Sequence, residues 1–150
     1  GALSYGQVSG LPLPRFASLK SDEVNVRRGP GGDHQIAWIS RPAGLPVEIV
    51  AEWDNWRKIR DADGEQGWVW HSLLTGKRDV LVEPWGKPGG TRPLRNGPEK
   101  DNRVVALLQR AVMAKVSRCT GQWCRIWDDG FDGWMSQDPL WGVYPGEKID

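Results

Sequence analysis

The stretches VNVRRGP, from Val24 to Pro30, and RPLRNGP, from Arg92 to Pro98, decide how this sequence is interpreted. Both contain an Arg-x-Gly-Pro segment, which begins at Arg27 in the first stretch and at Arg95 in the second, 68 residues later. A segment that recurs within a short chain is the first sign of an internal repeat, and the sequence on either side of it tests that interpretation.

Further matches follow in the same order after both stretches. The aligned segments are Trp56–Ile59 with Trp123–Ile126, Asp63-Gly64 with Asp129-Gly130, and Gly67-Trp68-Val69 with Gly133-Trp134-Met135. The offset shrinks only from 68 to 66 along the way, so chance does not explain the correspondence. The chain therefore contains two copies of one unit.

Each copy is predicted to be all-β. Val47, Ile49 and Ala51 occupy every second position of residues 47–52, as in a half-buried strand. Asp54-Asn55 and Asp63-Gly64 are typical of tight turns between short strands. No segment keeps an apolar period of 3.6, so helices should be single turns at most, with residues 71–74 as the best place for one. The fold class is thus two small β-barrels in tandem.

Composition shifts suggest where these barrels begin and end. Residues 1–16 are expected to form an arm, with Leu11–Pro14 extended. The first barrel is assigned to residues 17–82, with Val80–Val82 as its closing strand. The expected linker (83–91), second barrel (92–146) and tail (147–150) follow.

Composition and charge exclude some classes of function. The 150 residues include ten tryptophans, which can stabilise domains too small for a large core. The chain carries 20 basic and 19 acidic residues, without the basic excess of a nucleic-acid binder. No apolar run approaches the ~18 residues of a membrane span. Gly1 stands where a precursor has methionine, as in a processed mature chain or a trimmed one.

The repeat resembles the bacterial SH3-like domains, whose pattern is N-V-R-x-G-P, then G-x-x-V, W-x-x-I/V and G-W-V. The first copy matches at Asn25, Val26, Arg27, Gly29, Pro30, Gly44, Val47, Trp56, Ile59, Gly67, Trp68 and Val69. The second departs from it at Pro93 and Met135. Residues 141–147 also resemble the ending of exported tandem proteins of this type. The resemblance implies SH3-like barrels and a periplasmic or secreted protein, its signal peptide removed, that associates with cell-wall glycan or peptide.

The two cysteines are predicted to form a disulfide. If Gly121-Gln122 is a two-residue turn, Cys119 faces Cys124 in a non-hydrogen-bonded pair, where Cα atoms lie ~4.5 Å apart. That separation is at the short end of the range that a disulfide accepts. Glu52 and Arg57 occupy the same positions in the first copy, as an opposite-charge pair. The disulfide indicates an oxidising compartment.

The same register places Arg118 opposite Arg125, a like-charge pair that is tolerable if exposed, and a bulge can intervene. A reduced, buried cysteine pair is the alternative to the disulfide. A metal site is disfavoured, because zinc takes about four ligands and no histidine or further cysteine lies nearby in the sequence.

The sequence gives little support for catalysis. The histidines His34 and His71 both lie in the first copy. The two cysteines are expected to be bonded to each other, so neither supplies the free thiolate of a Cys-His catalytic system. The aspartates and glutamates near residues 61–65 and 128–132 are typical of turns, although an acid–base pair for glycoside hydrolysis stays open. The glycines at 29–32 lack the Lys-Ser/Thr of a phosphate loop. We expect no enzyme, no cofactor and no metal.

The tryptophans divide into core and recognition candidates. Trp68 and Trp134 are expected in the two cores, and Trp56 and Trp123 partly buried beside the turns. Because Trp38, Trp53 and Trp70 are not repeated, they are candidates for exposed recognition or, equally, for packing between the barrels. The tentative binding residues are Trp38, Trp53, Trp56, Arg27, Arg60, Trp70 and His71.

Together these observations favour a non-enzymatic, extracytoplasmic binding or adaptor protein. We expect Trp53 and Trp56 to share one face near Arg60, where the rings stack on a ligand. Arg27 and Arg60 would pair with its carboxylates, and His71 would cap a turn. The expected partner is a peptidoglycan fragment or an envelope protein, not a nucleic acid. The alternative is a structural subunit of an envelope complex with no small ligand.

Overall fold

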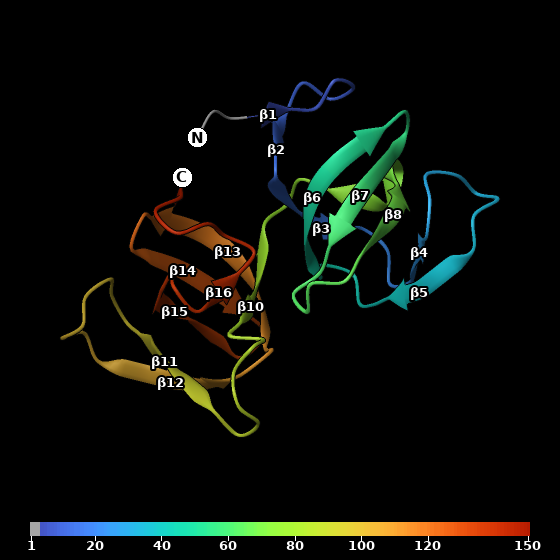
Figure 1. Ribbon diagram of the computed structural model, residues 1–150. Coiled ribbons are helices and arrows are strands. Elements are labelled where there is room, and N and C mark those ends of the chain that lie inside the picture. Colours follow the sequence, from blue (N-terminus) through green and yellow to red (C-terminus); the bar gives the residue numbers. More distant parts are fainter. Residues whose placement is uncertain (1–3) are drawn as a thin grey trace. The chain divides into compact units, whose positions relative to one another are not determined.

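A computed structural model describes residues 4–150, and the chain folds as two compact units, Gly1–Lys77 and Arg78–Asp150. We call them the first and second unit (Figure 1). Regular structure in the described part is strand, apart from one 3-10 turn at His71–Leu73. The predictions of an all-β class, of two units in tandem and of a single helical turn after Trp70 are confirmed.

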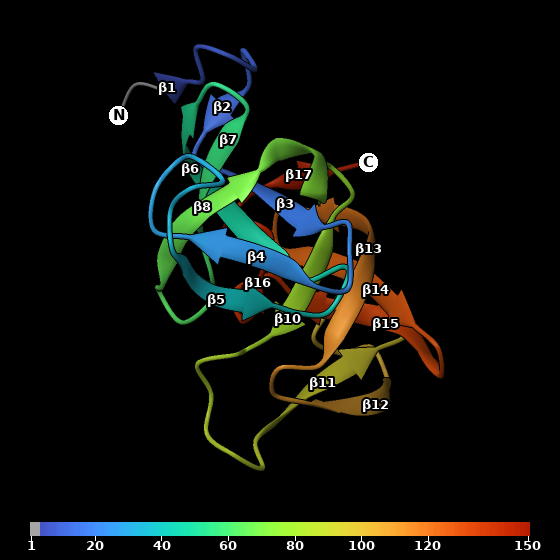
Figure 2. The ribbon, with the colours of Figure 1, turned by 90° about the vertical axis from the view of Figure 1, so that its right-hand side faces the viewer.

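The first unit is one curled antiparallel sheet with an additional hairpin at its amino end (Figure 2). Along the sheet the strand order is β5-β4-β8-β7-β6-β3-β9, and β1 pairs with β2 separately. The strands are β1 Ser4–Tyr5, β2 Pro12–Leu13, β3 Arg15–Leu19, β4 Val24–Arg27, β5 Ile36–Ser40, β6 Pro46–Trp53, β7 Trp56–Arg60, β8 Gln66–Trp70 and β9 Leu74–Thr75.

The second unit repeats this topology strand for strand. Its order is β12-β11-β15-β14-β13-β10-β16, with β17 added beside β13. The strands are β10 Asp79–Val82, β11 Thr91–Arg95, β12 Val104–Gln109, β13 Met113–Thr120, β14 Trp123–Asp128, β15 Phe131–Ser136, β16 Leu140–Trp141 and β17 Lys148–Ile149. The internal repeat detected in the sequence is therefore a repeat of the whole sheet.

Strand pairing corrects the expected assignment of Val80–Val82 to the first barrel. This segment lies in β10, which pairs with β13 and β16 of the second unit. It is the counterpart of β3, and Val80 and Val82 are fully buried in the second core. An apolar run does not reveal which of two neighbouring cores it fills, since the burial gained is the same in either.

The expected arm, linker and tail also contribute to the two units. Arg15 and Phe16 begin β3, which pairs with β6. Residues 83–90 form a loop of the second unit, and the Glu83 amide donates to the carbonyl of Pro139. Ile149 of β17 pairs with Cys119. Residues 1–3 of the expected arm lie outside the described residues.

The buried residues alternate along the strands, so each sheet has an inner and an outer face. The first core includes Val26, Val47, Ile59 and Val69, and the second includes Leu94, Ile126 and Met135. The sequence interpretation of Trp68 and Trp134 was wrong. Both alternate with buried residues, lie half-buried on the outer faces, and belong to neither core.

The repeated Arg-x-Gly-Pro segment closes the loop that follows β4 and β11. Arg27 Nη1 donates to the His34 carbonyl at 2.9 Å, and Arg95 Nη1 donates to the Asn102 carbonyl at 3.0 Å. A Cβ atom at Gly29 would meet the His34 ring at 2.5 Å, so the backbone approaches too closely for a side chain. The segment therefore recurs for a structural reason.

The hairpins β6–β7 and β13–β14 have the predicted register. Cys119 pairs with Cys124 and the disulfide is present, with a Cα–Cα distance of 4.1 Å. Arg118 lies opposite Arg125, and a bulge follows between Val116 and Arg118. In the first unit Glu52 pairs with Arg57, at 3.8 Å between Arg57 Nε and the carboxylate. An ion pair and a disulfide thus join the same two strands.

Candidate functional site

The outer face of the first unit carries a row of tryptophans across three strands. Trp53 of β6 lies opposite Trp56 of β7, and Trp56 lies opposite Trp70 of β8. Directly opposed residues share a face of a sheet, so the three rings line up. We call Trp53, Trp56 and Trp70 the tryptophan row.

Ring geometry and exposure make this row suitable for recognition. The Trp56 and Trp70 rings meet edge to face, with centroids 5.5 Å apart. His71 extends the row, since its ring lies 5.2 Å from that of Trp70. Trp53 is 65% exposed and Trp70 is 38% exposed, whereas Trp56 is half-buried between them. An apolar surface of adjacent rings is thus presented to solvent.

A second row lies beside the first and was missed by sequence reasoning. Trp68 of β8 pairs with Lys58 of β7 on one side and with Arg27 of β4 on the other. These residues lie on the same outer face as the tryptophan row. The signal was present in the alternation of β8, where Trp68 and Trp70 are two positions apart and face the same way.

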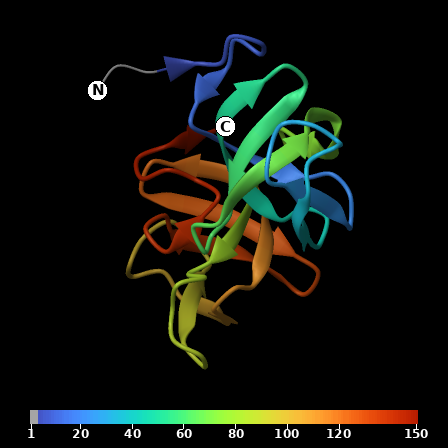
Figure 3. The ribbon, with the colours of Figure 1, turned by 45° about the vertical axis from the view of Figure 1, so that its right-hand side comes forward.

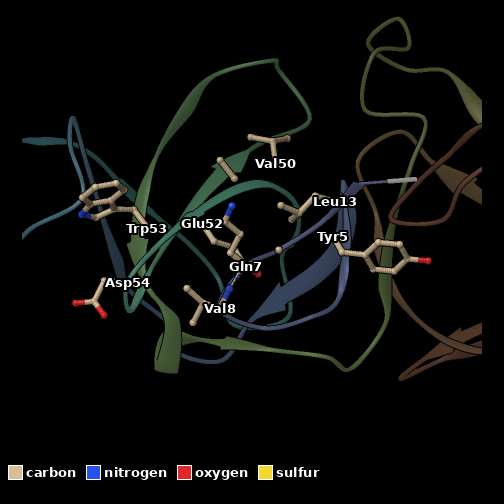
Figure 4. Close-up of a pocket in the computed structure, with 10 residues that line it drawn as sticks. Tyr5, Gln7, Val8, Leu13, Val50, Glu52, Trp53 and Asp54 are labelled. Atoms are coloured by element: carbon tan, nitrogen blue, oxygen red, sulfur yellow. Dashed lines mark hydrogen bonds between the residues drawn. The ribbon is translucent and has the colours of Figure 1, made fainter. Parts of the chain in front are cut away.

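A groove of about 660 Å³ adjoins the row at Trp53 (Figure 4). Tyr5 and Trp53 stand at its two ends, with Glu52 between them. Tyr5 and Val8 are 58% and 53% exposed, so the amino-terminal segment supplies much of its apolar lining. The full lining is Tyr5, Gly6, Gln7, Val8, Leu13, Val50, Ala51, Glu52, Trp53 and Asp54.

Glu52 fastens the amino-terminal segment that forms this groove. Its carboxylate accepts hydrogen bonds from the Val8 and Ser9 amides, both at 3.1 Å, and from the Ser9 hydroxyl. Arg15 pairs with it at 3.2 Å. Burial alone would raise the pKa of Glu52, but the bonds from Ser9, Arg15 and Val8 outweigh burial and lower that pKa to about 2. In Figure 3 the blue amino-terminal hairpin accordingly lies beside the tip of β6 and β7.

Two of the predicted site residues have structural contacts away from the row. Trp38 packs against the first core and donates from Nε1 to Ser40 Oγ at 2.8 Å. It is not an exposed ring. Arg60 forms an ion pair with Glu48 at the opposite end of β7, about 13 Å along the strand from Trp56. The structure thus groups Trp53, Trp56, Trp70 and His71, places Arg27 in the neighbouring row, and separates Trp38 and Arg60 from them.

The titratable groups of the first unit have contacts typical of turns and ion pairs. Asp61 accepts from the amides of Asp63 and Glu65, as expected of a turn, and burial raises its pKa. Among residues 4–150, no group of three or more His, Cys, Asp or Glu side chains is arranged to hold a metal ion. Within the same residues, no helix is long and apolar enough to cross a membrane.

Comparison of the sequence with known protein families gives a match to each unit. The model of the family described as "Bacterial SH3 domain" matches residues 20–76 and again residues 89–142, one match in each unit. The chain is also 29% identical over 129 residues to a Bacillus subtilis (strain 168) protein named "Putative N-acetylmuramoyl-L-alanine amidase YrvJ". The aligned region covers 81% of this chain but only 24% of that protein, so the chain spans about a quarter of its relative.

Solved structures give a weaker likeness. NlpC1 from Trichomonas vaginalis superimposes with a TM-score of 0.40 at 14% identity, covering 93% of this chain and 50% of that one. NlpC2 from the same organism gives 0.39 at 12% identity, covering 85% and 48%. We draw no functional argument from superpositions at this level.

Proposed function

The chain belongs to the bacterial SH3 domain family, and we propose that it is an extracytoplasmic binding module that recognises a component of the bacterial cell wall. Recognition is proposed to take place on the tryptophan row of the first unit and the groove beside it. The observation that carries this proposal is the in-register alignment of Trp53, Trp56 and Trp70, with Trp53 mostly exposed. A contiguous exposed patch of large apolar side chains often marks an interaction site.

The chemistry of the row suits a ligand with flat, weakly polar faces. Tryptophan gives a large, rigid contact area and loses little conformational entropy on binding. Lys58 and Arg27, in the row beside it, add positive charge for carboxylates carried by the same ligand. Peptidoglycan fragments combine sugar rings with carboxylate-bearing peptides, so they fit both features.

The likeness to an amidase supports the ligand class rather than an activity of this chain. The relative is named as acting on the bond between N-acetylmuramic acid and L-alanine, a linkage within peptidoglycan, and this chain spans about a quarter of it. A repeated non-catalytic module in such an enzyme would hold it on its substrate. The disulfide is consistent with an oxidising location.

The test is sedimentation of the purified protein with isolated peptidoglycan sacculi. Trp53→Ala should weaken retention about tenfold or more, because Trp53 lies where the row meets the groove and tryptophan is a typical hot-spot residue. Since Trp53 is 65% exposed, its truncation should leave the fold intact. The matched control is Trp85→Ala, which removes a ring of 58% exposure from a loop of the second unit. Equal retention of wild type and both variants would refute the proposed site.

A structural subunit of an envelope complex is the second candidate, and the edge of the second sheet favours it. β12 is the terminal strand of that sheet, and Val104, Val105 and Leu107 on it are 42%, 43% and 63% exposed. Exposed apolar edges are surfaces for strand addition by another chain. This candidate predicts that one envelope protein co-purifies, that Leu107→Lys abolishes its capture, and that sacculi retain nothing.

A further inference from the structure

The second unit differs from the first at the strand position that completes the tryptophan row. Trp56 faces Trp70 in the first unit, but its counterpart Trp123 faces Ser136. The small serine leaves space where the Trp70 ring lies in the first unit. That space is a pocket of about 290 Å³. Its lining is Arg92, Pro93, Arg95, Lys100, Trp123, Met135 and Ser136.

The charged side chains that line this pocket are all basic. Arg95 uses Nη1 to hold the Asn102 carbonyl, and the structure records no acceptor among residues 4–150 for its other N–H groups. Lys100 has no ion-pair partner among the same residues. Arg92 is bound through two nitrogens by Glu83, which neutralises much of its charge. The positive charge open to a ligand therefore comes from Arg95 and Lys100.

The remaining walls are apolar, with one hydroxyl. Trp123 offers a half-buried ring, Met135 is buried at 1% exposure, and Pro93 adds a rigid apolar edge. The volume is at the lower limit of the ~300–1,000 Å³ usual for small-molecule sites. A single sugar or a residue or two of peptide is about the largest group that fits.

We propose that this pocket binds the carboxylate of a small ligand, with the body of the ligand against Trp123. Arg95 and Lys100 bind the carboxylate, since charge-assisted hydrogen bonds are strong where a neighbouring ring excludes water. The Ser136 hydroxyl contributes one polar contact to the ligand body. This site is separate from the tryptophan row and lies on the other unit.

The first unit lacks two of the features that the pocket needs. Trp70 fills the space that Ser136 leaves open. The first unit's loop after β4, residues 28–35, has the same length as the second unit's loop after β11, residues 96–103. Gly32 occupies the position equivalent to Lys100. Of the two proposed carboxylate-binding residues, only Arg95 has a basic counterpart in the first unit, Arg27, which has the same contact with its loop. The carboxylate site is therefore expected in the second unit alone.

The test is a titration of the full-length, ¹⁵N-labelled protein followed by NMR. N-acetylmuramic acid and the dipeptide N-acetyl-alanyl-alanine supply a carboxylate from a sugar and from a peptide end. N-acetylglucosamine, which lacks the lactyl carboxylate, is the neutral control. We expect one or both acids to shift the Trp123 indole and the Lys100 and Ser136 amides, and the neutral sugar to leave them unchanged. Shifts of equal size with all three would overturn the proposal.

Two variants separate the pocket from general surface charge. Ser136→Trp introduces the residue found at the equivalent position of the first unit and should abolish binding by filling the space. Lys100→Ala should weaken binding about tenfold, as loss of one charge-assisted hydrogen bond does. Lys87→Ala removes an exposed lysine elsewhere in the second unit and should change nothing. If Ser136→Trp fails to fold, Lys100→Ala still decides, because unchanged affinity in that variant contradicts the proposal. Trp53→Ala should leave this titration unaffected, so the two sites can fail independently.

Discussion

The two units share one strand order, and two of the residue pairs at which they differ include neighbouring residues of one strand, β7 in the first unit and β14 in the second. On the inner side, the first unit has Glu52 opposite Arg57, where the second has a disulfide. On the outer side, the first has Trp56 opposite Trp70, where the second has a tryptophan opposite a serine. The inner pair joins the strands in both units, whereas the outer pair decides what surface each unit presents.

The inner pair also lies where each unit binds a further segment of the chain, residues 8 and 9 in the first unit and β17 in the second. Glu52 binds the backbone of residues 8 and 9 in the first unit. In the second, Cys119 lies beside Ile149 of β17. Gln137, buried at 3% exposure, donates to the carbonyls of residues 144 and 147. The same part of both sheets therefore receives a terminal segment, through a charge in one and through strand pairing in the other.

Removal of the carboxylate from the inner pair of the first unit should have the largest effect. Glu52→Ala leaves Arg15 and Arg57, which are 19% and 9% exposed, without their anion. Breaking such a pair by removing one partner costs roughly 3–5 kcal/mol. We expect the free energy of unfolding of the first unit to fall by that amount while the second unit is unchanged. NMR-monitored urea unfolding, followed at the methyl groups of Val69 and Met135, reports each unit separately.

The second-largest effect is expected from acid, which should lower the stability of the first unit. The pKa of Glu52 is about 2 in the folded chain against an ordinary 4.5, so its contribution is complete above pH 4.5 and is lost as the pH falls towards 2. The shift corresponds to about 3 kcal/mol of stability of the first unit. The measurement is urea unfolding between pH 6 and 2, read at Val69. Glu52→Gln is the control. If that variant keeps the full acid sensitivity, Glu52 is not its source.

Reduction of the disulfide should give the smallest of these effects, and only in the second unit. The bond closes a loop of few residues, for which the chain-entropy estimate is about 2 kcal/mol. Dithiothreitol should lower the urea midpoint read at Met135 and leave the Val69 transition in place. The double variant Cys119→Ser, Cys124→Ser should reproduce the shift and become insensitive to the reductant. A shift of both transitions would show that the units do not unfold independently.

Local pattern was sufficient to predict the hairpins. The offset between the copies aligned Glu52 and Arg57 with the cysteines, and turn geometry then gave the disulfide and the register around Arg118. The turns predicted at Asp54-Asn55 and Asp63-Gly64 lead into the strands β7 and β8. These features depend on residues close in the chain, where the geometry of a two-residue turn leaves few alternatives.

Features that depend on distant residues were not predictable. β10 was assigned to the wrong unit because its burial is equally favourable in either core. Trp38 was a candidate for exposed recognition or for packing between the barrels, because nothing in the sequence shows that its ring packs over Gly67, where an added Cβ would meet that ring at 3.3 Å. The groove at Trp53 depends on the amino-terminal segment folding back onto Glu52, and the pocket at Trp123 on a loop that brings Lys100 to it.

The exchange of tryptophan for serine opposite Trp123 has a consequence for how duplicated domains diverge. The position of Ser136 lies on the outer face of the sheet. The buried residues near it, such as Met135 and Cys124, therefore occupy the same strand positions as their counterparts in the first unit. A gene copy can therefore acquire a new specificity at this position without losing the ability to fold, and selection can act on the two copies separately. In this chain the two copies keep the same strand order and differ at the strand pair on which the two proposed binding surfaces depend.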